Sequence, residues 1–270
     1  KESEYIKRFE ARGIKVIEWG KPVYRSAGVY AYFAFIKKEL KQVRPDIFWE
    51  VNSIIPINLG GSFKTLITIH DMFPIQYVRY FGKIYSYYFK FNLGVTLRHT
   101  DMILYNSERT KDDTEMYFPK AKKIPSCNAY IISNPLTRYV PPKDENYFLY
   151  VGNMEKRKGV DILVKAYRRY REEGGTRPLI LAGKMQEDEQ LLETALTEVE
   201  GLTYLGYVSH TTRYDLYNNC SCFVFPSMAE GFGMPILEVM KHNKPILASN
   251  LKIFDEVVGD CVERFSLAGD

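Results

Sequence analysis

The chain has 270 residues, of which 46% are hydrophobic and 26% charged, and its formal net charge is +4. This length allows two domains of ordinary size, and the composition is typical of a globular protein with a packed core. A charge this small gives no support for nucleic-acid binding, and the lack of any run of about 18 apolar residues argues against a transmembrane helix.

Strand and helix patterns alternate along the first half of the chain. Short apolar runs predict strands at residues 15–18, 47–51, 65–69, 102–105 and 130–132. Apolar residues at helical spacing predict helices near residues 5–12, 31–43, 83–99 and 108–118. This alternation favours a Rossmann-like domain over residues 1–135. It opens on a helix with no strand before it, so we expect a native segment to be missing from this end.

The second half alternates more regularly. Strands are predicted at residues 147–151, 179–182, 203–205, 222–225 and 245–248. Helices are predicted over residues 160–167 and 187–199. Residues 136–146, rich in proline and charge, predict a linker before a second Rossmann-like domain over residues 147–270. The chain stops just after a possible strand at residues 261–265, so we also expect C-terminal helices to be missing. The predicted fold class is α/β, with two doubly wound domains.

Residues 77–99 combine many aromatic side chains with four basic ones. Basic amphipathic helices lie on membrane surfaces, so this segment is a candidate contact for a membrane or a lipid-linked substrate. An aromatic helix face packed in the core explains the same pattern, and the sequence leaves both explanations open.

Two carboxylates, Glu230 and Glu238, flank a Gly-x-Gly-x-Pro turn that follows the predicted strand at 222–225. Pro235 suits the first position of a helix, which places Glu238 in the first helical turn. Both carboxylates should face the crevice where open α/β sheets bind ligands. The glycines let the backbone approach a phosphate, while the carboxylates accept hydrogen bonds from sugar hydroxyls. A turn required only for packing, and a first-turn acid favoured by the helix dipole, are the structural alternatives.

A basic loop follows the first strand of the second domain. Lys158, next to a helix N-terminus, can reach the same crevice, and Arg157 offers a second donor. Glu155 and Lys156 are expected to be solvated. In the first domain, His70 and Asp71 end a predicted strand, and His70 is expected to face this crevice from across the two domains.

The chain resembles the retaining glycosyltransferases of family 4, which have the two-domain GT-B fold. The segment from Glu230 to Glu238 matches the E-x7-E motif of that family, and residues 150–159 are similar to its donor-phosphate loop. Segments 206–208, 225–227 and 245–249 are similar as well, and His70-Asp71 and residues 105–107 match less specifically. The resemblance covers the chain from about residue 46 onward.

The resemblance implies a hexosyltransferase that uses a nucleotide diphosphate sugar, GDP- or UDP-linked, in bacterial polysaccharide or lipopolysaccharide assembly. Glu230 would contact the transferred sugar, Lys158 would neutralise the leaving diphosphate, and His70 would lie by the sugar or acceptor. The donor contacts implied at other positions are Gly152, Asn153, Arg157, Tyr207, Val208, Gly231, Phe232, Gly233 and Glu238. The family usually works without a metal, and this sequence has no Asp-x-Asp motif.

The acceptor is expected to be a saccharide or a lipid-linked molecule. No signal peptide is visible, and the four cysteines have no metal or redox spacing, so we expect a cytoplasmic protein. Peripheral contact with the inner face of the cell membrane is a further expectation. Two departures from the family stand out, an asparagine at position 153 where many members carry arginine, and Lys241-His242-Asn243 in place of a small-residue turn. A nucleotide-sugar-binding scaffold without turnover is therefore an alternative function. A GT-B epimerase is another, although the E-x7-E spacing argues against it.

Overall fold

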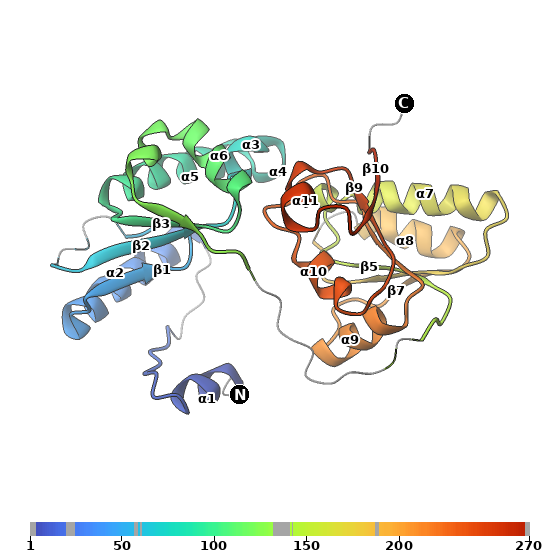
Figure 1. Cartoon of the computed structure of the whole chain (residues 1–270), viewed down its shortest axis with the longest axis horizontal. Helices are drawn as coiled ribbons and strands as arrows, with labels where there is room; N and C mark the ends of the chain where they lie inside the picture. The colour runs from blue at the N-terminus through green and yellow to red at the C-terminus, as the bar shows by residue number, and fades with distance from the viewer. Residues whose placement is uncertain are drawn as a thin grey trace.

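Two parallel β-sheets, each packed against helices, lie side by side along the long axis of the molecule (Figure 1). The computed structural model describes residues 4–19, 25–56, 59, 61–131, 141, 143–186 and 189–267. The first sheet has the order β1-β2-β3-β4 and the second the order β10-β9-β8-β5-β6-β7. All the strand pairs are parallel, which confirms the predicted doubly wound α/β fold class.

The strands of the two sheets have the following bounds. The first sheet holds β1 (Ile47–Glu50), β2 (Lys64–Ile69), β3 (Met102–Tyr105) and β4 (Ser126–Asn128). The second holds β5 (Phe148–Val151), β6 (Leu179–Ala182), β7 (Leu202–Tyr204), β8 (Cys222–Phe225), β9 (Ile246–Ser249) and β10 (Glu263–Phe265).

The helices fall into two groups along the chain, those that precede the second sheet and those within the second domain. The first group is α1 (Glu4–Glu10), α2 (Arg25–Val43), α3 (Phe73–Gln76), α4 (Val78–Phe81), α5 (Lys83–Thr96) and α6 (Glu108–Tyr117). The second is α7 (Val160–Glu172), α8 (Glu189–Glu198), α9 (His210–Asn219), α10 (Met234–Met240) and α11 (Lys252–Val257). Within the described residues, no helix is long and apolar enough to cross a membrane.

Two predicted strands are wrong. Residues 15–18 form no strand, and Trp19 beside them packs on Tyr32 and Phe35 of α2 instead. The fourth strand of the first sheet is β4 rather than residues 130–132, of which 130 and 131 are not in a strand and 132 lies outside the described residues. An edge strand pairs with one neighbour only, so β4 does not need the apolar run on which the prediction relied. The predicted linker also falls mostly outside the described residues.

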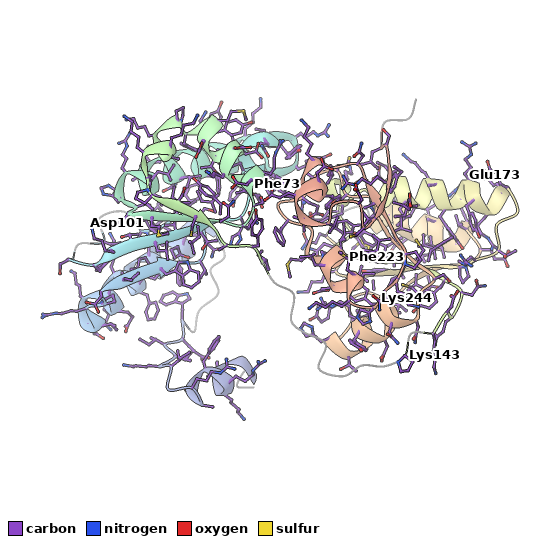
Figure 2. The ribbon with its side chains drawn as sticks, viewed as in Figure 1. Phe73, Asp101, Lys143, Glu173, Phe223 and Lys244 are labelled. Carbon is purple, nitrogen blue, oxygen red and sulfur yellow. The ribbon has the colours of Figure 1, made fainter. Side chains whose placement is uncertain are left out.

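The second sheet is buried on both faces, as its continuous apolar strands require. Phe223 and Phe225 of β8 are fully buried on one side, together with Ile236 and Val239 of α10. Helices α7 and α8 cover a second core on the opposite face. Figure 2 shows Phe223 inside this domain. The first sheet has a single core cluster, in which Leu93 of α5 packs with the residues of β2 and β3.

The direction in which successive strands are added to the second sheet changes at β5. This strand comes first along the chain, yet it lies between β8 and β6, so the later strands are added on both sides of it. Ligands of open α/β sheets bind at such a switch point, outside the carboxyl ends of the strands. The loops that follow β5 and β8 are therefore the expected ligand site of this domain.

Candidate active site

A cavity of about 670 Å³ lies between the two domains. Residues that follow β2 and β3 of the first sheet form one wall, and the loops after β5 and β8 form the other. The cavity brings together seven of the predicted site residues, namely His70, Arg157, Lys158, Glu230, Gly231, Phe232 and Gly233. Segments about 160 residues apart in the sequence thus meet in one cleft.

Lys158 and Glu230 form an ion pair at the switch point. Lys158 Nζ lies 2.6 Å from Glu230 Oε1, and the two side chains are only 15% and 8% exposed. Ser227 Oγ donates a second hydrogen bond to the same oxygen at 2.5 Å. Each charge is therefore compensated by the other, as charges removed from water must be.

Arg157 is held by three contacts. Its Nη1 donates to the carbonyl of Ala229 at 2.8 Å, and its Nη2 lies 3.2 Å from Glu155 Oε2. Its guanidinium also stacks 5.3 Å from the ring centroid of Phe73, which Figure 2 shows on the side of the first domain that faces the second. The expectation that Glu155 is solvated is wrong, because its carboxylate also accepts from Asn153 Nδ2 and its side chain is 17% exposed.

Gly231 is needed for a reason other than the predicted one. A Cβ atom there would lie 2.7 Å from the carbonyl oxygen of His70, across the domain boundary. Ser107 Oγ also donates to the Gly231 carbonyl at 3.4 Å. The contact between domains thus requires glycine at 231, whether or not a phosphate approaches. At Gly233 the backbone φ of 90° favours glycine.

The His70 ring is anchored by the backbone of the turn that follows β1. His70 Nε2 lies 2.8 Å from the Val51 carbonyl oxygen, and a carbonyl can only accept, so Nε2 carries a proton. The Nδ1 atom is then left for another partner. The His70 carbonyl is fixed as well, by Asn106 Nδ2 at 2.8 Å and Thr110 Oγ1 at 3.1 Å.

Asp71 was not predicted as a site residue, although it follows His70 directly in the sequence. It lines the cavity, and burial raises the pKa of its carboxyl above the ordinary value. The Phe73 N–H, which donates to Asp71 Oδ1 at 3.0 Å, and the charge of Arg157 act in the opposite direction. The His-Asp pair in the sequence was the signal that could have identified it.

Glu238 is placed differently from the prediction. Helix α10 begins at Met234, so Glu238 lies in its second turn, and the first turn contains no acidic residue. Its carboxylate accepts from Tyr217 Oη at 3.0 Å and lies 3.4 Å from Arg213 Nη2. It does not line the cavity between the domains, so the expectation that both carboxylates face this crevice is correct only for Glu230.

Four other predicted residues also lie outside the cavity lining. Gly152 N–H donates to the Ala182 carbonyl, and Tyr207 is 70% exposed, with Lys184 Nζ 5.2 Å from its ring centroid. Val208 packs against the core cluster of β8, and Asn153 is tied to Glu155.

A second link between the domains has no signal in the sequence. The Glu256 carboxylate of α11 accepts from the backbone N–H of Glu108 at 2.6 Å and of Arg109 at 3.1 Å. These N–H groups have no partner inside the helix because they belong to the first turn of α6. Ser107 caps the same helix, since its side chain accepts from Thr110 N–H at 3.0 Å.

Family models match both halves of the chain. The model for "Glycosyltransferase Family 4" matches residues 2–136, and the model for "Glycosyl transferases group 1" matches residues 137–269. The chain belongs to glycosyltransferase family 4. The GT-B fold that the resemblance implied is confirmed by the two facing parallel-sheet domains.

Relatives of this family 4 chain include O-antigen mannosyltransferases. It is 32% identical to the O-antigen chain mannosyltransferase B of Escherichia coli over 238 residues, which cover 82% of this chain and 61% of the relative. It is 26% identical to the O-antigen chain mannosyltransferase RfbU of Salmonella typhimurium, covering 85% of this chain and 63% of the relative. The chain thus spans about three fifths of the length of these relatives. The solved sucrose-phosphate synthase of Thermosynechococcus elongatus shares the fold, with a TM-score of 0.70 at 17% identity over 90% of this chain and 66% of the synthase.

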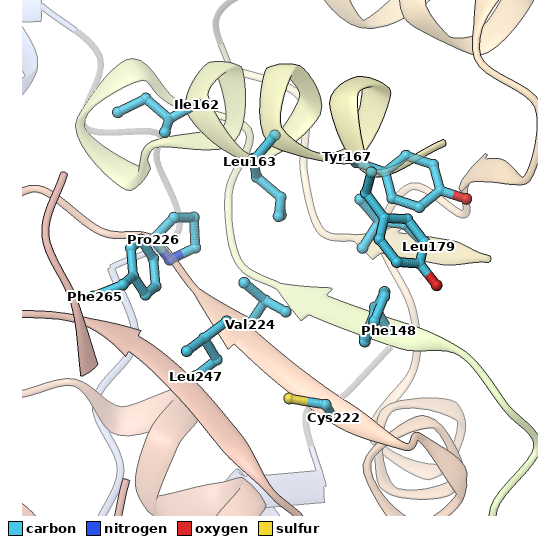
Figure 3. Close-up of a pocket in the computed structure, with 12 residues that line it drawn as sticks. Phe148, Ile162, Leu163, Tyr167, Leu179, Cys222, Val224, Pro226, Leu247 and Phe265 are labelled. Carbon is cyan, nitrogen blue, oxygen red and sulfur yellow. The ribbon is translucent and has the colours of Figure 1, made fainter. Parts of the chain in front are cut away.

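A second hollow in this family 4 chain is apolar and lies away from the cleft. It has a volume of about 260 Å³ and lies between α7 and the strands β8 and β9, where Leu163, Val224 and Leu247 line it (Figure 3). It offers no charged side chain to a phosphorylated ligand, whereas the interdomain cavity presents Arg157 and Lys158 at the switch point and is therefore the candidate active site.

Proposed function

We propose that this protein transfers a hexose from a nucleotide diphosphate sugar to a hydroxyl group of a saccharide acceptor, with retention of the anomeric configuration. The observation that carries the proposal is the Lys158–Glu230 pair at the switch point of the second domain, opposite His70 of the first. The mannosyltransferase relatives favour GDP-mannose as the donor to test first.

Binding of the donor exchanges the partners of the ion pair. The diphosphate takes the place of Glu230 beside Lys158, and the Glu230 carboxylate turns to hydroxyl groups of the sugar. Lys158 keeps an anionic partner and Glu230 keeps hydrogen-bond donors during this exchange, so neither group bears the cost of several kcal/mol that an isolated buried charge carries. As the bond to the diphosphate breaks, negative charge develops on the leaving oxygen, and Lys158 stabilises it electrostatically.

His70 is the proposed contact of the first domain with the reacting hydroxyls. With Nε2–H donated to the Val51 carbonyl, Nδ1 is the acceptor that can take a hydrogen bond from a sugar or acceptor hydroxyl. On the nucleoside side, Glu238 is the proposed acceptor for the ribose diol, with the base near Tyr207 and Val208. Support comes from α10, which begins at the cavity with Met234 and carries Glu238 one turn further.

We propose that the reaction needs no metal, because Lys158 supplies the positive charge and the sequence has no Asp-x-Asp motif. A binding protein without turnover is the second candidate. It is favoured by the pairing of both basic groups, since Arg157 and Lys158 each already contact a carboxylate.

A panel of donors separates the two functions. Full-length protein is incubated with GDP-mannose, UDP-glucose, UDP-galactose and UDP-N-acetylglucosamine, and release of nucleoside diphosphate is measured with and without a chelator. We expect turnover with one donor, insensitivity to the chelator, and retained configuration in the product by NMR. A thermal shift with a donor that is never turned over, with or without saccharide acceptors, would support the binding protein instead.

A further inference from the structure

Helix α5 exposes an apolar stripe on its outer face. Ile84, Tyr87 and Phe91 are 89%, 73% and 67% exposed, and their spacing of i, i+3 and i+7 places them on one side of the helix. The opposite side is buried, with Phe89 and Leu93 in the core of the first domain. Isolated apolar residues on a surface are ordinary, but an aligned row of three is a typical sign of an interaction site.

The charged residues of this segment all have one sign. Residues 72–100 contain no Asp or Glu, while Arg79, Lys83, Lys90 and Arg98 are all exposed. Lys83 and Lys90 are seven residues apart and so lie on one side of the helix, next to the apolar stripe, since Tyr87 is four residues after Lys83 and three before Lys90. Neither lysine forms an ion pair with any other residue in the part of the chain that the structure describes.

We propose that the outer face of α5 docks on the surface of an anionic lipid bilayer. The three apolar side chains enter the boundary between headgroups and acyl chains, where an amphipathic tyrosine is especially stable. The two lysines lie beside them at the depth of the phosphate groups, to which their positive charge is complementary. A protein partner would need acidic groups opposite both lysines and a matching apolar pocket, whereas a bilayer supplies both along the whole stripe.

The same helix connects this surface to the cleft. Tyr85 and Phe89, on another face of α5, line the interdomain cavity together with Phe81 at the end of α4. A protein docked through α5 therefore holds the first-domain wall of its cavity near the bilayer surface. In terms of the proposed function, on which this step rests, the acceptor is a lipid-linked saccharide that enters along the aromatic wall.

Vesicle binding tests the docking surface without donor or acceptor. Full-length protein is sedimented with vesicles of phosphatidylcholine alone or of phosphatidylcholine with phosphatidylglycerol. We expect binding to the anionic vesicles only, and a loss that grows with salt concentration. The double variant Lys83→Gln/Lys90→Gln should bind about 25-fold more weakly, from about fivefold for each lysine. The triple variant Ile84→Ser/Tyr87→Ser/Phe91→Ser should lose at least about tenfold.

Matched controls remove the same chemistry elsewhere on the first domain. Lys122→Gln/Lys123→Gln removes two exposed lysines, and Ile47→Ser/Met116→Ser removes two exposed apolar side chains. Both should bind like the unaltered protein, and every variant should keep its melting temperature. Equal weakening by control and α5 variants would overturn the proposal, as would no binding to anionic vesicles. A dimer that the α5 variants dissociate, without vesicle binding, would assign the stripe to a second copy instead. Because no turnover is measured, failure of the transferase assay would not alter these outcomes.

Discussion

Replacement of Lys158 by methionine tests the ion pair of the cleft. Methionine keeps the apolar stem of the lysine but leaves the Glu230 carboxylate, 8% exposed, with Ser227 as its remaining partner. Removal of one member of a buried pair costs about 3–5 kcal/mol. The hydrogen bond from Ser227 and the adjacent cavity reduce this penalty, so we expect a loss of about 2–3 kcal/mol. In a domain of this size that lowers the melting temperature by about 5–10 °C.

The double variant Lys158→Met/Glu230→Gln separates stability from chemistry. It removes both charges, so most of the lost melting temperature should return, whereas transfer of sugar should remain abolished in both variants. Melting is followed by circular dichroism and turnover by release of nucleoside diphosphate. Lys165→Met, at an exposed lysine on α7, is the matched control and should change neither quantity. The reasoning would be refuted if the Lys158→Met protein had the melting temperature of the unaltered protein. It would also be refuted if the double variant were less stable than Lys158→Met.

Three further substitutions probe the contacts around the cleft. Gly231→Ala puts a Cβ 2.7 Å from the His70 carbonyl, so the domains must shift, and turnover should fall about 10–100-fold in steady-state assays. Glu256→Ala removes the acceptor for two N–H groups of α6, so the amides of residues 108 and 109 should exchange about fivefold faster in hydrogen-exchange measurements. Burial raises the pKa of the Asp71 carboxyl, so its contribution to stability is lost as pH rises from about 3.9 through the folded-state pKa. Asp71→Asn should therefore raise the melting temperature at pH 7 and flatten its fall over that range.

The sequence predicted the second domain well because its strands are buried on both faces. Such strands are continuous apolar runs, and the bounds of β6 and β8 agree with the prediction to the residue. The first domain was harder. Residues 15–18 contain a short apolar run that predicted a strand, but only pairing with a neighbour makes a strand, and the sequence pattern does not reveal pairing. Strand β4 is exposed along one edge and so has no apolar signal.

For the site, the sequence predicted which positions meet but not which side chains they contact. Spacing and loop position were enough to bring Lys158 and Glu230 together at the ends of β5 and β8, since the topology of a doubly wound sheet fixes that meeting. The partners of Arg157 were out of reach, because Phe73 belongs to the other domain and no local pattern links them. Glu256 was missed for the same reason.

The two carboxylates of the E-x7-E segment are held by cations from different elements. Glu230 is paired with Lys158 from the loop after β5, and Glu238 with Arg213 from α9. The spacing thus places Glu230, in the loop before α10, on the wall of the interdomain cavity. It places Glu238 on α10, beside α9. In the proposed function, each carboxylate turns to a hydroxyl group of the donor while its cation turns to a diphosphate or other donor oxygen, so each carboxylate keeps a hydrogen-bond partner. Such an exchange would keep each carboxylate hydrogen-bonded and each cation beside negative oxygen atoms, and on the proposed function this is how two carboxylates can lie close to a diphosphate.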